Sequence, residues 1–336
     1  MSTHPELVAA AAKHLADILQ DALLMQPTEH ILVIYDTQAG LAQIMVDAYR
    51  IAAPTATFVD FATVTPEQVR EALNARTQGD LIVLVQSTNF RLNEFRLRIE
   101  LFARGLKNIE HVHLTRIPED QWARYIEALS YDKEYYHRRG HALKAILDPA
   151  QEIVVECEDT RLEYKSPMED SKLNIGDYTK MKNKGGTFPI GEVFSEPKDL
   201  TKVNGTARIF GYAGDDHRVR IVEPFLVQVT DGIMTAPEAP AEFQHILELI
   251  KSDEEVYVRE FGLGLSRGMG KHALVSDITA FERQKGLHLS LGAKHTIYKK
   301  ENMHRKKGRY HIDIFVDIKR ITVDGRAIFE NGDFTV

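Results

Sequence analysis

The first half of the chain repeats one pattern, a short apolar stretch followed by an amphipathic one. The apolar stretches are rich in Val, Ile and Leu, as buried parallel strands are, and they span residues 30–35, 56–60, 80–85 and 109–114. Helical patterns lie between them, at residues 41–49 and from Thr65, where Thr is the N-cap and Pro66 the first helical residue. These strand–helix units predict a doubly wound, Rossmann-like α/β domain with a parallel sheet over residues 1–150.

The pattern changes after a charged helix that begins near residue 131 and ends at Asp148-Pro149. Strand patterns and glycine turns follow, with strands expected at residues 153–156, 160–164, 207–211, 219–222, 225–229, 286–292 and 310–316. One amphipathic helix interrupts them, from Pro240 to Lys251, with an apolar face of Phe243, Ile246, Leu247 and Ile250. Residues 151–336 are therefore predicted to form an α+β domain rich in antiparallel strands.

The composition of the 336 residues excludes several classes of protein. A single cysteine excludes an internal disulfide framework and a cysteine-based zinc ribbon, and a net charge of -7 argues against nucleic-acid binding by bulk charge. No stretch approaches the roughly 18 apolar residues of a membrane span, and the N-terminal segment lacks the basic start and unbroken apolar run of a signal peptide. We expect a soluble, cytoplasmic protein that binds neither nucleic acid nor membrane.

A nucleotide site is common in parallel sheets, but no glycine-rich phosphate-binding motif follows any of the expected strands. Asp36 and Gly40 follow the first strand, at the end where ligands bind in such sheets. We expect these two residues to have ordinary structural roles in the loop and not to bind a ligand.

Two histidines in the second half lie within expected strands. His311 and Asp313 are two residues apart, so their side chains point to the same face, and an imidazole beside a carboxylate is half of a site for Zn, Co, Mn or Fe. The alternative is a surface His–Asp pair. His288 lies between apolar residues, where a lone histidine is more often a core residue than a ligand.

Two acidic residues lie in similar surroundings. Glu260 is expected at a strand end before a glycine-rich turn, and Glu192 follows another glycine turn at residues 185–186. A buried carboxylate is costly unless it is paired or bound to a metal. Together with the histidines and Asp313, these residues provide a ligand count suited to two adjacent divalent ions (zinc, cobalt or manganese), which would orient a carbonyl and activate a water molecule.

Four short motifs resemble, in sequence and in order, those of the metallo-aminopeptidases of the aminopeptidase T type, also called the thermophilic aminopeptidase family. They are residues 191–197 (GEVFSEP), 260–264 (EFGLG), 288–292 (HLSLG) and 311–313 (HID), and Val203-Asn-Gly205 also fits the pattern. The resemblance spans about residues 130–325 and extends faintly into the α/β region before them.

The resemblance implies a co-catalytic pair of metal ions in the second domain. It implies that Glu192 holds one ion, that Glu260 bridges the two and that the shells are completed by His288, His311 and Asp313. Members of this family are homodimers that remove N-terminal residues from peptides, and the α/β half of each subunit helps to close the site.

One departure from the family concerns the catalytic machinery. The family has a catalytic Tyr seven residues after the first histidine, where this chain has His295, with Tyr298 close by. Either side chain is a candidate donor of a hydrogen bond to a developing oxyanion. The basic segment from Lys299 to Arg309 joins the His288 and His311 strands, and it either attracts an acidic substrate or forms a solvated hairpin.

Three functions remain open at this point. The first is a metal-dependent hydrolase of peptide-like amides, most simply an aminopeptidase, with a narrow substrate range suggested by His295 and the basic segment. The second is a mononuclear iron ring-cleaving dioxygenase of the dihydroxypyridine type, which resembles the chain around His311 and Asp313 but has His in place of Glu260 and lacks the acid at Glu192. The third is a non-catalytic dimeric binding protein on the same fold.

Overall fold

The computed structural model describes residues 4–90, 97–293, 298 and 309–336. By its internal contacts the chain divides into two compact units, each built from separate segments. The first unit comprises Met1–Tyr136, Gly176–Ile190 and Val275–Ala280, and the second comprises His137–Ile175, Gly191–Leu274 and Phe281–Val336. The boundary expected at residue 150 stays a prediction. The two units interleave along the chain instead of meeting at one point.

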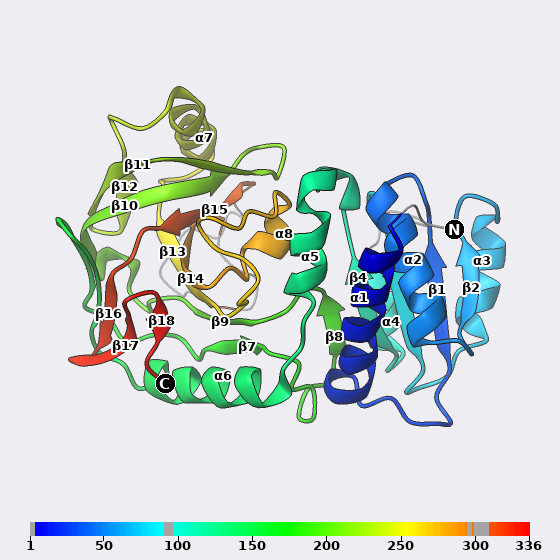
Figure 1. Ribbon diagram of the computed structural model, residues 1–336. Helices are drawn as coiled ribbons and strands as arrows, with labels where there is room; N and C mark the ends of the chain where they lie inside the picture. Colours follow the sequence, from blue (N-terminus) through cyan, green and yellow to red (C-terminus); the bar gives the residue numbers. More distant parts are fainter. Residues whose placement is uncertain (1–3, 91–96, 294–297, 299–308) are drawn as a thin grey trace. The chain divides into compact units, whose positions relative to one another are not determined.

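The first unit contains a parallel sheet, drawn in blue, cyan and green in Figure 1. Its strands lie in the order β2-β1-β3-β4-β8, and every neighbouring pair is parallel. The strands are β1 (Ile31–Tyr35), β2 (Thr57–Asp60), β3 (Leu81–Val85), β4 (Lys107–His111) and β8 (Lys184–Thr187). The predicted α/β domain with a parallel sheet is therefore confirmed, and β1 to β3 match the expected stretches. The fourth strand, β4, spans Lys107–His111 and overlaps the expected residues 109–114 only in part.

The fifth strand corrects the prediction of a glycine turn at residues 185–186. Gly185 and Gly186 lie inside β8, which pairs with β4. A Cβ built on Gly185 would lie 1.8 Å from the carbonyl oxygen of Asn108, and the residue has φ +105°. Glycine is needed here because any side chain would collide with the backbone of the neighbouring strand.

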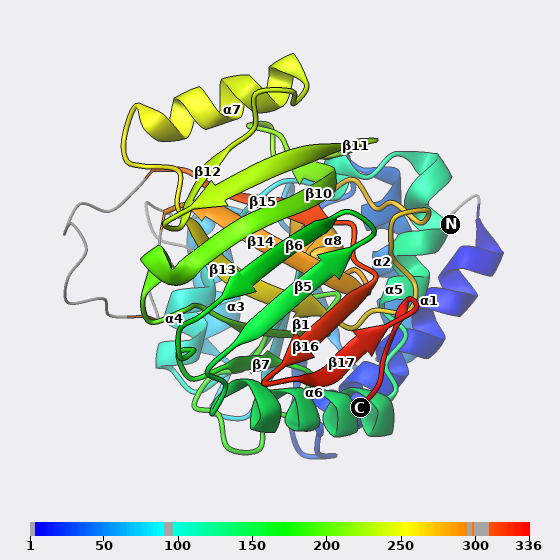
Figure 2. The same ribbon diagram turned by 90° about the vertical axis from the view of Figure 1, so that its left-hand side faces the viewer.

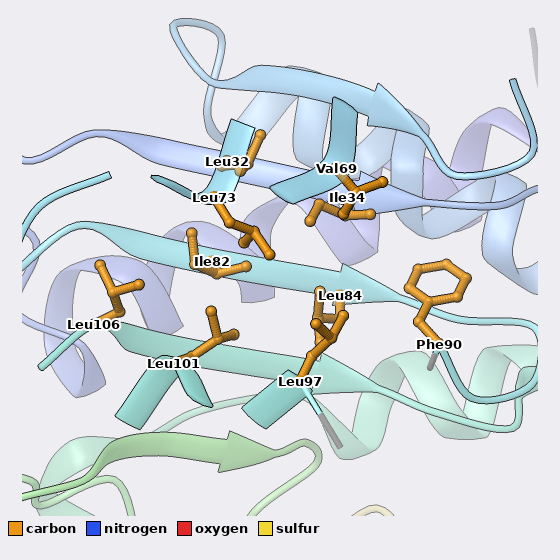
Figure 3. Packing of buried hydrophobic residues seen from close by; sticks show 10 residues of the cluster. All are labelled: Leu32, Ile34, Val69, Leu73, Ile82, Leu84, Phe90, Leu97, Leu101 and Leu106. Carbon is orange, nitrogen blue, oxygen red and sulfur yellow. The ribbon is translucent and has the colours of Figure 1, made fainter. Parts of the chain in front are cut away.

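Helices cover both faces of this sheet. They are α1 (Pro5–Asp17), α2 (Gly40–Ala52), α3 (Pro66–Asn74), α4 (Leu97–Ala103) and α5 (Trp122–Ala128), with a π-helical turn at Ile18–Ala22 and 3₁₀ turns at Leu114–Arg116 and Glu119–Gln121. Helix α3 begins as predicted, since the Thr65 hydroxyl accepts from the Gln68 backbone N–H in a capping box. Figure 3 shows one core, in which apolar residues of α3 and α4 pack on Leu32, Ile34, Ile82 and Leu84 of the strands.

The second unit is dominated by antiparallel strands, as predicted. Most form one curled sheet in the order β18-β17-β16-β5-β6-β10-β15-β14-β13-β9-β7, and β11 pairs with β10 and β12. Figure 2 shows β10, β6, β5, β16 and β17 side by side. The strands are β5 (Ile153–Cys157), β6 (Thr160–Tyr164), β7 (Lys172–Asn174), β9 (Glu192–Ser195), β10 (Val203–Ala213), β11 (Val219–Thr230), β12 (Ile233–Thr235), β13 (Val258–Gly264), β14 (Gly286–Gly292), β15 (His311–Val316), β16 (Arg320–Val323), β17 (Arg326–Glu330) and β18 (Asp333–Phe334).

Helices are few beside this sheet. Helix α7 (Ala241–Lys251) buries the predicted apolar face and lies outside β11 and β12 in Figures 1 and 2. Helix α6 (Lys133–Leu147) begins in the first unit and continues in the second, and α8 (Ile278–Phe281) and the 3₁₀ turn Leu200–Lys202 are short. Among the described residues, no helix is both long enough and apolar enough to cross a membrane.

Strand β11 corrects a second expectation, of two strands at residues 219–222 and 225–229. The two stretches form one continuous strand, which pairs with β10 through a register shift between Ile209 and Gly211. Pro224 lies at this irregularity, where a residue without an N–H donor does not interrupt the ladder.

Candidate metal centre

Three neighbouring strands of the second unit place two carboxylates beside one imidazole. Gly262 of β13 pairs with His288 of β14, and Gly264 of β13 pairs with Glu192 of β9. Glu260 of β13 lies at a register shift between Val258 and Phe261, and its carboxylate reaches the same place as the carboxylate of Glu192 and the His288 ring. His288, Glu192 and Glu260 are all buried, with exposed fractions of 0%, 4% and 5%.

The ligand atoms of these three residues converge. Nε2 of His288 lies 3.3 Å from Oε1 of Glu192 and 3.3 Å from Oε1 of Glu260. One ligand atom from each residue lies within 4.8 Å of the other two. We call these residues the Glu192–Glu260–His288 group. One imidazole and two carboxylates at this spacing can hold a divalent cation.

The glycines beside this group correct the prediction of a turn after Glu260. Strand β13 continues through Gly264, and a Cβ on Gly262 would lie 2.1 Å from Nε2 of His288. The glycine therefore makes room for the imidazole ring, which packs against its backbone. The three side chains supply the oxygen and nitrogen donors that a divalent ion takes.

Charge within the group follows from its burial and its partners. Burial lowers the pKa of His288, but hydrogen bonds to Glu192 and Glu260 outweigh it and raise that pKa to about 10. Burial raises the pKa of Glu192, whereas the charges of Arg283 and His288 prevail and hold it below its usual value. A divalent cation at this position would replace the proton on Nε2, since its charge satisfies the same carboxylates.

Strand β15 places His311 and Asp313 beside this group. Asp313 pairs with Ser290 of β14, and Nε2 of His311 lies 3.3 Å from Oδ1 of Asp313. Asp313 is 4% exposed, and apart from the contact to His311 its Oδ1 has no hydrogen-bond partner in the described part of the chain. The His311 side chain is 36% exposed. Within the described residues, this pair does not join the Glu192–Glu260–His288 group at the 4.8 Å spacing.

Electrostatics explain the protonation of this second pair. Burial of His311 lowers its pKa, but the Asp313 charge and hydrogen bond outweigh it and raise the pKa of His311 to about 10. Burial raises the pKa of Asp313, while His311 and His288 lower it below its usual value. These shifts favour an imidazolium beside a carboxylate, on a strand that β14 separates from the strand of Glu260.

Sequence reasoning missed Arg283, which lies against the group. Its Nη1 is 3.6 Å from Oε2 of Glu192 and also contacts Glu282, and the Arg283 side chain is 9% exposed. A buried guanidinium beside a candidate ligand reduces the negative charge of the donor set. The signal in the sequence was a basic residue five positions before His288, in a stretch without strand or helix periodicity.

The two candidates for the oxyanion donor differ in what the structure describes. His295 and residues 299–308 of the basic segment lie outside the described residues. Tyr298 is 5% exposed, and its hydroxyl lies 3.3 Å from the backbone carbonyl oxygens of Asp170 and Phe194. This hydroxyl can donate to either carbonyl, so its proton is engaged by the backbone of the same unit.

At the end of strand β1 in the first unit, Asp36 and Gly40 have the ordinary structural roles that were expected. The Asp36 carboxylate accepts from the backbone N–H groups of Gln38 and Ser87, both at 3.0 Å. Gly40 packs against Trp122, whose ring would lie 2.4 Å from an added Cβ. Both residues thus have local structural roles.

Comparison with known proteins gives a structural match. No protein-family model matches the chain, and no curated protein matches its sequence. The chain is similar in structure to wild-type AmpT from Thermus thermophilus, an aminopeptidase T, with a TM-score of 0.58 and 14% sequence identity. The match covers 98% of this chain and 99% of that one. At this identity the similarity shows that the two chains share a fold.

Proposed function

We propose that the protein is a metal-dependent hydrolase of peptide-like amide bonds, most simply an aminopeptidase. The observation that carries this proposal is the convergence of the buried Glu192, Glu260 and His288, whose ligand atoms lie within 4.8 Å of one another. The fold shared with an aminopeptidase T over nearly the whole chain supports the same class of activity.

The residues of the second unit would hold two divalent ions of zinc, cobalt or manganese. Glu192 and His288 would hold one ion, Glu260 would bridge, and His311 and Asp313 would complete the second position. When bound, such ions polarise an amide carbonyl and lower the pKa of a water molecule. The fit rests on donor chemistry, since oxygen and nitrogen donors without thiolate suit these metals.

This chain's own residues would then bind the peptide and move protons. An oxygen of Glu192 or Glu260 that does not hold an ion can accept a proton from the attacking water and return it to the leaving amine. The free ammonium of a peptide N-terminus would pair with carboxylate charge at the same place. His295 is the better candidate for the oxyanion donor, because the Tyr298 hydroxyl already has backbone acceptors.

The chemistry of the group favours the hydrolase over the dioxygenase. A mononuclear iron site of the facial-triad type uses two histidines and one carboxylate. The Glu192–Glu260–His288 group has the reverse ratio, one histidine and two carboxylates, which favours hard or borderline ions that do not change oxidation state. We also propose a homodimer, as the family resemblance implies, which sedimentation of the full chain would test.

Metal analysis of the purified full chain, with assays on aminoacyl amides, tests the proposal. We expect about two zinc, cobalt or manganese ions per chain, and loss of ions and amide hydrolysis in Glu260→Gln. Glu330→Gln is the matched control, because Glu330 is an exposed acid paired with Arg320 on the same sheet. One iron with oxygen uptake would support the dioxygenase instead. A chain that binds no ion would contradict both enzymes and leave the non-catalytic binding protein as the remaining hypothesis.

A further inference from the structure

A cavity of about 90 Å³ lies in the first unit, and no residue of the candidate metal centre lines it. It is lined by residues that follow β3, by residues at the end of β4 and just after it, by Thr187 at the end of β8, by residues of α4 and by Thr279 of α8. The carboxyl ends of parallel strands are the usual ligand-binding edge of an open α/β sheet. In Figure 3, Phe90 lies beyond the arrowhead of the strand that carries Ile82 and Leu84.

One wall of the cavity presents a hydrogen-bond donor. Gln86 is 2% exposed, and its Oε1 accepts from the backbone N–H of Phe90 at 2.6 Å. This bond fixes the orientation of the side-chain amide, so the atom that remains for another contact is the NH₂ nitrogen, Nε2. In the part of the chain that the structure describes, Nε2 of Gln86 has no hydrogen-bond partner. A buried donor in a cavity wall calls for an acceptor in the cavity.

A second wall carries one charge of each sign. Nη1 of Arg98 lies 2.9 Å from Oε2 of Glu110 and 2.8 Å from Oγ1 of Thr187. Arg98 and Glu110 both line the cavity, so their net contribution to its charge is zero. A simple anion gains little from such a wall, because Glu110 cancels the attraction of Arg98. A ligand with both a carboxylate and an ammonium group can pair with both residues.

We propose that this cavity binds the head group of a free α-amino acid. Its carboxylate accepts from Gln86 Nε2 and Arg98, and its ammonium group donates to Glu110. The volume is below the 150 Å³ or so of a cavity that holds benzene, so it suits a head group with a small side chain. Phe90 and Leu97 supply an apolar lining for that side chain. None of these residues belongs to the candidate metal centre, so the inference does not depend on the proposed function.

Calorimetric titration of the full chain tests this site with four probes: glycine, L-alanine, acetate and methylammonium. The titrations are repeated with EDTA, which removes any contribution of metal ions to amino-acid binding. We expect glycine and L-alanine to bind at least about tenfold more tightly than either half-ligand, because each charge-assisted pair adds affinity. In the NMR spectrum, glycine should shift the side-chain NH₂ signals of Gln86.

A variant with a matched control completes the test. Glu110→Gln preserves the size of the side chain and should weaken glycine binding about tenfold or more, whereas acetate should bind more tightly because the charge of Arg98 is no longer offset. Arg70→Gln is the control, because it removes one member of the Arg70–Glu100 ion pair, which does not line the cavity. If Glu110→Gln does not fold, the comparison of probes in the unaltered protein decides. Equal affinities for glycine and acetate, or a Gln86 signal that glycine leaves unmoved, would overturn the proposal.

Discussion

Gly262 and His288 face each other across strands β13 and β14, and the space between them is too small for a β-carbon. A Cβ on Gly262 would lie 2.1 Å from Nε2 and 2.2 Å from Cε1 of His288. The same Nε2 faces Glu192 and Glu260 at 3.3 Å. The glycine thus determines where the imidazole lies relative to both carboxylates.

Replacing this glycine should disturb metal binding more than folding. In Gly262→Ala the added methyl group displaces the His288 ring, because the ring is the nearest group within its reach. We expect the affinity for zinc to fall by about 10- to 100-fold, as for other displaced ligands, and the free energy of unfolding to fall by about 1–3 kcal/mol. Zinc titration with a competing chelator and urea unfolding measure the two effects.

Gly270→Ala is the matched control for that experiment. Gly270 belongs to the same unit, and a Cβ there would meet nothing within 4 Å. Zinc affinity should be unchanged in this variant. If Gly262→Ala binds zinc as tightly as the control does, His288 is not a ligand.

Metal binding should release a proton from His288. Its pKa is raised to about 10, so the ring carries a proton at neutral pH that an ion on Nε2 must displace. We expect the apparent affinity to rise by up to about tenfold per pH unit below that pKa, with about one proton released or more if His311 also binds. Calorimetry in two buffers of different ionisation enthalpy counts the protons. An affinity independent of pH would contradict this assignment.

Without metal, the same histidine should make stability fall as the pH rises, and His311, whose pKa is also raised to about 10, adds a similar slope that His288→Gln leaves in place. The folded pKa of His288 is about 10, above its usual 6.5, so its contribution is complete below about pH 6.5 and is lost as the pH rises through 10. The loss is at most about 1.4 kcal/mol per pH unit. Urea unfolding with EDTA at several pH values above 7 measures it, and His288→Gln should make the profile shallower. Constant stability in the unaltered protein would rule out the raised pKa.

The α/β half could be predicted well because its signals are local. Strands β1 and β3 are continuous apolar stretches, and the Thr65 cap lies next to the helix that it begins. Strand β8 could not be found in this way, since its sequence, Lys184-Gly-Gly-Thr187, has no apolar residue and its partner β4 is distant in the chain. Its pairing depends on the close approach that Gly185 allows.

The candidate site could be predicted only in part. His288 and Glu260 stood out as polar residues among apolar neighbours, and the structure brings both to Glu192. The glycine at position 262 was expected in a turn because glycine is rare inside strands, whereas its reason is the ring of a residue on the next strand. Arg283 has no periodic context, so only the three-dimensional structure places it beside Glu192.

Removing the charge of Arg283 should have opposite effects on metal affinity and on stability. In Arg283→Gln the donor set becomes more negative, so we expect affinity for zinc to rise by roughly 3- to 10-fold. The metal-free protein should lose about 1–3 kcal/mol, because the buried Glu192 carboxylate loses a cationic neighbour. Arg320→Gln is the control, since its contact to Glu330 has the same 3.6 Å distance but is exposed. A fall in zinc affinity in Arg283→Gln alone would contradict the electrostatic argument.

The oxyanion donor can be identified by comparing two variants. The Tyr298 hydroxyl lies 3.3 Å from the carbonyl oxygens of Asp170 and Phe194, so Tyr298→Phe should remove about 1 kcal/mol of stability. Its kcat for an aminoacyl amide should stay within about threefold of the unaltered protein, because the hydroxyl proton is engaged by the backbone. His295→Phe should lower kcat by about 10²–10³-fold if His295 donates to the oxyanion. The opposite result, a large loss of kcat in Tyr298→Phe with stability preserved, would assign the donor to Tyr298.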